Sequence, residues 1–196
     1  MKKTEIILAI LAVIAVMLNY LLVPGGVMLT VLTLSSLSCL YFAFSFALLN
    51  DIRFRNIFKS DSYKNIGALK IVGAIGTGWA LSMAMNGLLF KLLYWPGAAV
   101  SIVGGMVSLS IPFIICVVKY VLGSNRAYYS RVLIRTGIVI TCCVFIMPFS
   151  SEQLHQFKYR NYPSFLEAEK QYHENPDNQE LLNKYEEERQ KMDEQQ

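Results

Sequence analysis

Five long apolar runs with almost no charge set the main constraint on how this chain folds. A helix rises 1.5 Å per residue, so about 20 apolar residues cross the ~30 Å hydrocarbon layer of a membrane. Apolar residues make up 54% of the 196 residues, and they are gathered in these runs instead of being spread along the chain. The runs predict membrane-spanning helices at residues 6–23, 27–49, 71–90, 98–118 and 132–149.

Two short segments between the runs resemble each other. Leu18–Leu29 is echoed by Phe90–Ser101 at an offset of 72 residues, and each segment contains a Pro-Gly pair. Proline and glycine end a helix and allow a tight reversal. The pairs are Pro24-Gly25 and Pro96-Gly97. We therefore predict an all-α integral membrane protein with five transmembrane helices, arranged as two Pro-Gly helical hairpins, a parallel internal repeat, plus one span.

Charge divides the chain into two regions. Residues 1–149 contain twelve Lys or Arg against three acids, whereas residues 150–196 contain six against eleven. The net charge of +4 is thus an average of two opposed parts, and it gives no argument for nucleic acid as a partner. The cations lie at alternate ends of the spans, which by the positive-inside rule predicts a cytoplasmic N-terminus and a periplasmic tail. In the segment at residues 50–65, cations mix with aromatic residues, which indicates either contact with membrane lipid or an ordinary cytoplasmic loop.

The acidic tail, residues 150–196, is predicted to be helical and to lie outside the membrane. Helices are expected near residues 165–174 and 178–192. Their starts carry the spacing of a capping box, with Ser164 and Glu167 in the first and Asp177 and Glu180 in the second. The apolar stripe of the second helix is thin, which favours docking on another surface. The stripe consists of Leu181, Leu182, Tyr185 and Met192.

Catalytic chemistry lacks the residues that it needs. No Asp or Glu occurs between Ser62 and Ser151 or within the first two predicted spans, and both histidines, His155 and His173, are in the tail. The four cysteines all fall in predicted spans without metal-ligand spacing. We predict no enzyme activity, no cofactor and no metal site.

Lys91 is the sharpest single candidate for a functional residue. It lies one helical turn from the end of the third predicted span, near Asn86 and Trp95. Two interpretations stay open: its ammonium faces a buried partner or an anion at the hairpin tip, or its stem snorkels to the interface beside the aromatic belt. Asn86 and Asn19 lie near corresponding ends of two spans and are expected to form interhelical hydrogen bonds.

Small residues recur every fourth position on two spans. Such stripes let helix backbones approach closely, either inside the protein or in an oligomer. They are Ser35, Cys39, Ala43 and Ala47 on the second span, and Gly97, Ser101 and Gly105 on the fourth.

The stretch from about residue 70 to 117, with Phe-Lys-Leu-Leu-Tyr-Trp-Pro-Gly-Ala at residues 90–98, resembles the transmembrane hairpin of the GldL family. Members of this family are motor subunits of gliding motility and type IX secretion in Bacteroidetes. The resemblance implies a bacterial inner membrane and a stator-like hairpin whose second helix carries a functional glutamate. The corresponding position here is near Leu109, between Ser108 and Ser110, so the acid is missing. That absence argues against an energised motor.

Taken together, these features lead us to expect a non-enzymatic scaffold or accessory subunit of a cell-envelope complex. Its protein partner would bind the tail or the small-residue helix faces. The alternative is a small transporter or channel with a passive or anion-selective path between the hairpins. That path would be lined by Asn19, Asn86, Lys91 and the serine-rich face of the second span.

Overall fold

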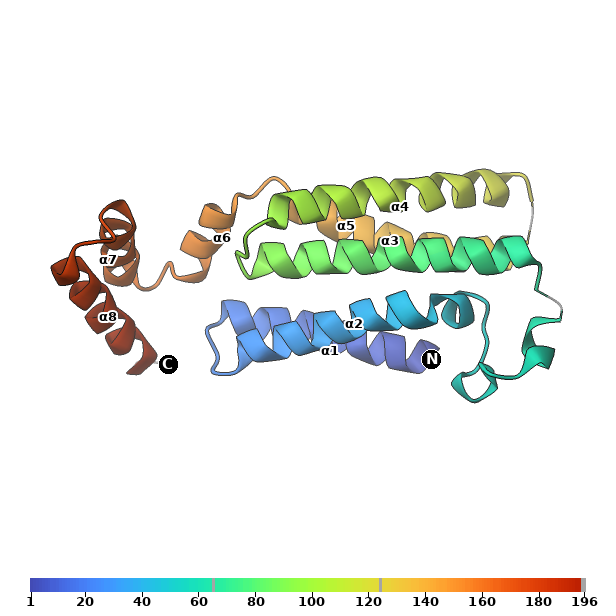
Figure 1. Cartoon of the computed structure of the whole chain (residues 1–196), viewed down its shortest axis with the longest axis horizontal. Coiled ribbons are helices and arrows are strands. Elements are labelled where there is room, and N and C mark those ends of the chain that lie inside the picture. Colours follow the sequence, from blue (N-terminus) through green and yellow to red (C-terminus); the bar gives the residue numbers. More distant parts are fainter. Residues whose placement is uncertain (65, 124, 195–196) are drawn as a thin grey trace.

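The computed structural model describes residues 1–64, 66–123 and 125–194, and the regular secondary structure of these residues is entirely helical (Figure 1). Two short 3-10 turns, Phe54–Asn56 and Ser60–Tyr63, lie between the second and third helices. The helices are α1 (Lys2–Tyr20), α2 (Gly26–Leu49), α3 (Ala68–Leu92), α4 (Ala98–Val121), α5 (Arg126–Ile146), α6 (Ser151–Lys158), α7 (Pro163–Glu174) and α8 (Gln179–Glu194).

Helices α1 to α5 are long and apolar enough to cross a membrane, which confirms the prediction of five such helices. The largest differences from the predicted bounds are in α1 and α5, which begin at Lys2 and Arg126, ahead of the apolar runs. The polar and basic residues ahead of these two runs continue the backbone hydrogen bonding of the helix, because no proline or glycine lies among them. Helix α5 ends at Ile146, two residues before Pro148, which has no backbone N–H to continue the hydrogen bonding of the helix.

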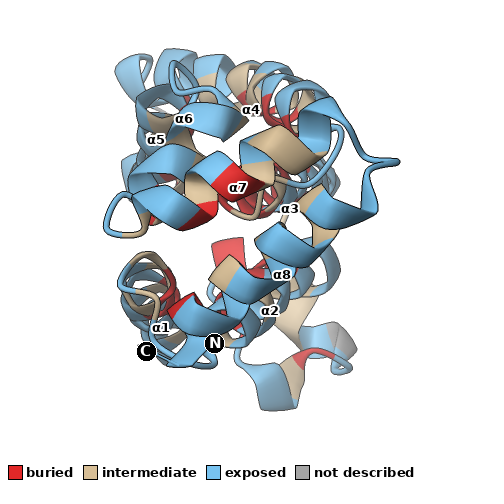
Figure 2. Ribbon diagram, turned by 90° about the vertical axis from the view of Figure 1, so that its left-hand side faces the viewer, coloured by how far each residue is buried: buried red, intermediate tan, exposed pale blue. Residues whose placement is uncertain are grey.

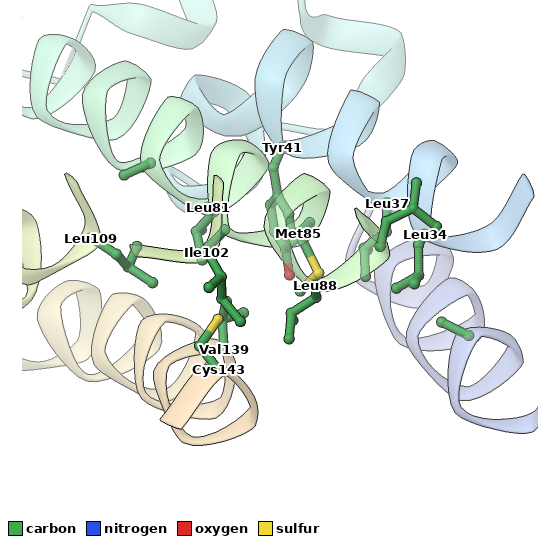
Figure 3. Close-up of a cluster of buried hydrophobic side chains, with 14 of the residues drawn as sticks. Leu34, Leu37, Tyr41, Leu81, Met85, Leu88, Ile102, Leu109, Val139 and Cys143 are labelled. Carbon is green, nitrogen blue, oxygen red and sulfur yellow. The ribbon is translucent and has the colours of Figure 1, made fainter. Parts of the chain in front are cut away.

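The five long helices form a bundle in which α3 is central. It packs against α2, α4 and α5, while α1 packs along α2 (Figure 1). Leu81 of α3, Leu109 of α4 and Val139 of α5 are all buried in one apolar cluster, together with Leu37 and Tyr41 of α2 (Figure 3). The cluster therefore joins the two hairpins and the fifth span into one core.

Small residues do bring helices together, but the predicted stripe on α2 faces outward. Ser35, Cys39 and Ala43 are exposed, so these three residues are not packed inside the bundle. Ala47, the last member, is buried against Ile52 in the segment that follows α2.

The seam between α2 and α3 lies on the neighbouring face of α2. The hydroxyls of Ser38 and Ser82 are 2.7 Å apart and hydrogen-bonded, and Ser45 lies against Gly78. A β-carbon at Gly78 would collide with the Ser45 side chain, so only glycine permits this approach.

On α4, one of the two predicted packing residues lies at a close contact with another helix. Gly105 is buried against α3, where a β-carbon would come within 2.6 Å of the Ala84 Cα atom. Ser101 is half-buried.

The two Pro-Gly turns have the same backbone conformation. Gly25 and Gly97 have φ angles of 81° and 80°, in the left-handed region that favours glycine, and Leu22 and Tyr94 both have φ of 58°. The backbone hydrogen bond from Val23 N to Leu18 O, at 3.0 Å, recurs 72 residues later from Trp95 N to Phe90 O, at 2.9 Å. The sequence echo thus corresponds to one turn geometry used twice.

Within residues 150–194 the tail forms three helices, where two were predicted. Helix α6 begins with a capping box, in which Ser150 Oγ accepts from Gln153 N at 3.0 Å and Gln153 Oε1 accepts from Ser150 N at 2.8 Å. The capping boxes predicted for the other two helices are absent from the described residues: α7 begins at Pro163, which places Ser164 inside the helix, and Asn178 caps α8 by accepting from Glu180 N.

Helices α7 and α8 pack on each other and lie beyond one end of the bundle (Figure 1), so that they are in front of it in the end-on view of Figure 2. Phe165 and Ala168 of α7 and Met192 of α8 are buried. Tyr172 and Tyr185 stack with ring centroids 5.6 Å apart. The apolar stripe predicted to dock elsewhere is therefore used, at least in part, for the contact with α7.

Candidate docking platform and buried ionic network

Helix α6 lies across both Pro-Gly turns and connects the tail to the bundle. The Lys158 ammonium donates to Asn19 Oδ1 of the first hairpin at 2.8 Å, in a buried contact. The Tyr94 hydroxyl of the second hairpin donates to the Leu154 carbonyl at 3.1 Å. One short helix thus holds both hairpins at the same end of the bundle, which we call the turn end.

His155 joins α6 to α7 and to the second turn. Its Nδ1 lies 3.5 Å from Glu169 Oε2 of α7, and its ring meets Tyr94 edge to face and contacts Tyr159. Burial lowers the pKa of His155, although the Glu169 carboxylate opposes that shift. Burial also lowers the pKa of Lys158 and raises that of Tyr94. Docking of α6 therefore makes the charged form of each of these groups less favourable than it is in water.

Lys91 is buried in the last turn of α3, with 6% of its surface exposed. Among the described residues it has no ion pair and no side-chain hydrogen bond. Its stem is therefore covered by the bundle, but its ammonium nitrogen is not among the fully buried polar atoms of the described residues that lack a partner, so both interpretations of Lys91 stay predictions.

The other predicted residues at the turns have different surroundings. Asn19 is buried and bound to Lys158, whereas Asn86 is exposed on α3. Trp95 is 42% exposed and meets Phe90 edge to face. The remaining turn residues are exposed: Pro24, Gly25, Pro96 and Gly97.

The structure does not bring these residues together along the path suggested for a transporter. Asn19 and Lys91 are buried, but Asn86 and Ser35, which were expected to line the same path, lie on the outside of the bundle. The polar residues that the sequence singled out therefore do not converge on one channel.

A buried ionic network lies at the opposite end of the bundle, where α1 begins; we call it the N-terminal end. Arg135 of α5 binds Glu5 of α1 with two hydrogen bonds, from Nε to Oε1 at 2.6 Å and from Nη2 to Oε2 at 2.7 Å. The Tyr41 hydroxyl of α2 donates to Glu5 Oε1 at 2.9 Å. Glu5 is only 6% exposed, so its charge is compensated almost entirely by these partners.

Asp51 extends the network toward the surface. This residue follows α2, and its carboxylate forms ion pairs with both Lys2 and Arg131. Three helices and the segment after α2 are thereby linked through side chains at the N-terminal end.

Sequence reasoning missed this network because it placed Glu5 just outside the first span. Helix α1 begins at Lys2, so the expectation that the early spans contain no carboxylate is wrong for Glu5. A signal was present: Arg135 falls inside an apolar run, where a charge calls for a partner. Only Glu5, Asp51 and Asp61 offer a carboxylate outside the tail.

Comparisons with known proteins add no identity. No family model matches this sequence, and no curated protein or solved structure matches it significantly. The resemblance to the GldL hairpin stays a hypothesis. At the position where that resemblance implies a functional glutamate, Leu109 is completely buried, and the Ser110 hydroxyl binds the Val107 carbonyl of its own helix.

Proposed function

We propose that this chain is a non-enzymatic membrane protein that serves as a scaffold or accessory subunit, and that its α7–α8 hairpin docks a partner protein. The observation that carries the proposal is the attachment of α6 to both Pro-Gly turns through Asn19 and Tyr94. A tail held in this way presents α7 and α8 at a fixed position above the bundle. Preorganisation of this kind lowers the entropy lost when a partner binds.

Charge supports a partner with a basic surface. Residues 163–194 contain ten acidic residues and four Lys or Arg. Glu186 and Glu187 are exposed on α8, and Glu167 is exposed on α7. Complementary charge raises association rates and excludes wrong partners more than it adds affinity.

The distribution of cations supports an orientation for this platform. Lys2, Lys3 and the basic segment at residues 50–64 lie at the N-terminal end, and the tail lies at the other (Figure 1). By the positive-inside rule, the N-terminus is cytoplasmic and the tail is on the outer face. In a bacterial inner membrane, as the GldL resemblance implies, that face is periplasmic.

The proposal is tested by gentle extraction of the tagged chain from its native membrane and native mass spectrometry of what co-purifies. We expect a foreign subunit in fixed stoichiometry. Truncation after Arg160, which removes α7 and α8 but keeps α6, should abolish co-purification. The Glu186→Gln/Glu187→Gln variant should weaken it more at low salt than at high salt.

A matched control replaces the exposed pair Gln179 and Gln190 of the same helix by alanine and should leave the complex intact. A pure homo-oligomer that carries bound solute, with or without the tail, would contradict the scaffold and favour transport.

A further inference from the structure

A cleft of about 320 Å³ lies between α1 and α5 at the N-terminal end, directly beside the ionic network. Its apolar wall comes from four helices, and its charged rim comes from α1 and α5. The wall and rim include Ile6 and Ala9 of α1, Leu37 of α2, Met85 of α3, Ile138 of α5, and the charged residues Lys2, Glu5, Arg131 and Arg135.

The cleft exists because α1 packs along α2 and not along α5 in the described chain; the long Glu5 and Arg135 side chains bridge the space between them. It opens sideways, toward the surroundings of the bundle. Ile6 is 57% exposed, and Ile134 and Ile138 are each 59% exposed. In a membrane this opening faces lipid.

Charge increases toward the mouth of the cleft. Inside, Glu5 and Arg135 neutralise each other in a closely bonded pair. At the mouth, two cations share a single carboxylate, because Lys2 and Arg131 both pair with Asp51. One positive charge is therefore in excess, on side chains that are 49% and 30% exposed.

We infer that this cleft binds one anionic glycerophospholipid. An acyl chain would lie along the apolar wall between α1 and α5, and the phosphate would meet Lys2 and Arg131 at the mouth. The volume is at the lower end of the range for small-molecule sites, which fits one chain and not a whole lipid. Each cation near an anionic headgroup contributes favourably to such binding.

This inference rests on the proposed membrane location, but it is independent of the scaffold role. The chain truncated after Arg160 keeps the whole cleft and should bind lipid like the full chain. Loss of a partner protein and loss of lipid are thus separate outcomes.

The test is native mass spectrometry of the full chain released from nanodiscs that contain equal amounts of dioleoyl phosphatidylglycerol and dioleoyl phosphatidylcholine. We expect one phosphatidylglycerol retained per chain. The Lys2→Gln/Arg131→Gln variant should reduce its retention about tenfold. The control Lys119→Gln/Arg126→Gln removes two exposed cations from the same end of the bundle and should change retention less than twofold.

A second variant probes the apolar wall without altering charge. Ala9→Phe places a ring in the cleft and should displace the lipid, whereas Ala43→Phe adds the same ring to the exposed face of α2 and should not. Equal retention of the two lipids, equal loss in the controls, or a lipid-free dimer with α1 and α5 at its interface would each overturn the inference.

Discussion

The two ends of the bundle are held together by different means. At the turn end, each hairpin closes through a tight turn of its own backbone, and α6 adds two hydrogen bonds across the turns. At the N-terminal end no short connection joins α1 to α5, which are more than a hundred residues apart in sequence, and charged side chains link them instead. At the turn end, where one helix of a hairpin leads directly into the next, the glycine turns hold the two helices together. At the N-terminal end, where α1 and α5 are far apart in sequence, a buried ion pair holds them together.

The largest effect should come from removing one partner of that pair. Glu5→Gln leaves the Arg135 guanidinium buried without a counter-charge, and we expect the free energy of unfolding to fall by about 3 kcal/mol. Circular dichroism of denaturant unfolding in detergent micelles measures this. The double variant Glu5→Leu/Arg135→Leu should recover most of the loss, since no charge is then left alone. A double variant as unstable as the single one would show that the pair itself stabilises the end.

A second variant lies between the two ends and tests how much the close contact between α3 and α4 contributes to the free energy of unfolding. Gly105→Ala forces a methyl group against Ala84, and overpacking of this kind lowers stability by about 2 kcal/mol. Gly104→Ala, one residue earlier and facing open space, is the control and should have no effect or a slight stabilising one. The same unfolding measurement applies. If the two alanine variants had equal free energies of unfolding, the close contact between α3 and α4 would not be at Gly105.

At the turn end we expect a smaller and more local effect. Lys158→Met removes the hydrogen bond to Asn19, worth about 1.5 kcal/mol, but it also removes a buried charge, so the net loss is less. Hydrogen exchange should become faster in α6 and unchanged in α3. Arg160→Met, two residues on and exposed, should leave α6 protected. Faster exchange throughout α1 would mean that the tail stabilises the bundle as a whole.

The smallest effect concerns pH. Because the pKa of His155 is lowered in the docked tail, the undocked tail binds a proton first as the pH falls. The stability of docking is therefore fully present above the ordinary histidine pKa of about 6.5 and decreases as the pH falls through the lowered value. Hydrogen exchange of α6 and α7 at pH 7.5 and 5.5 should reveal the change, and His155→Gln should abolish it. His173→Gln should retain it; if instead it removes the effect, the titrating group has been misassigned.

Local features of the sequence predicted much of the fold. Length and apolarity indicated the five long helices, and the Pro-Gly pairs indicated the turns, because each depends on neighbouring residues. The choice of packing face did not follow, since α2 has small residues on two faces: Ser35 and Cys39 are exposed, and Ser38 and Ser45 form the seam.

Candidate sites were harder to predict because they depend on long-range contacts. Asn19 was singled out, but its partner Lys158 lies in α6, a helix that the sequence analysis did not predict. Glu5 and Arg135 are separated by 130 residues, and only folding makes them neighbours.

The position of Arg135 also bears on how the protein would respond to bilayer thickness. Arg135 is nine residues into α5, about 13 Å along its axis, whereas Glu5 is in the first turn of α1. Since these residues are bonded, α5 cannot slide along its axis relative to α1. In a thinner bilayer the two helices would have to tilt together. Helix α6 follows α5 after four residues, so the height of α7 and α8 above the lipid surface would change with that tilt.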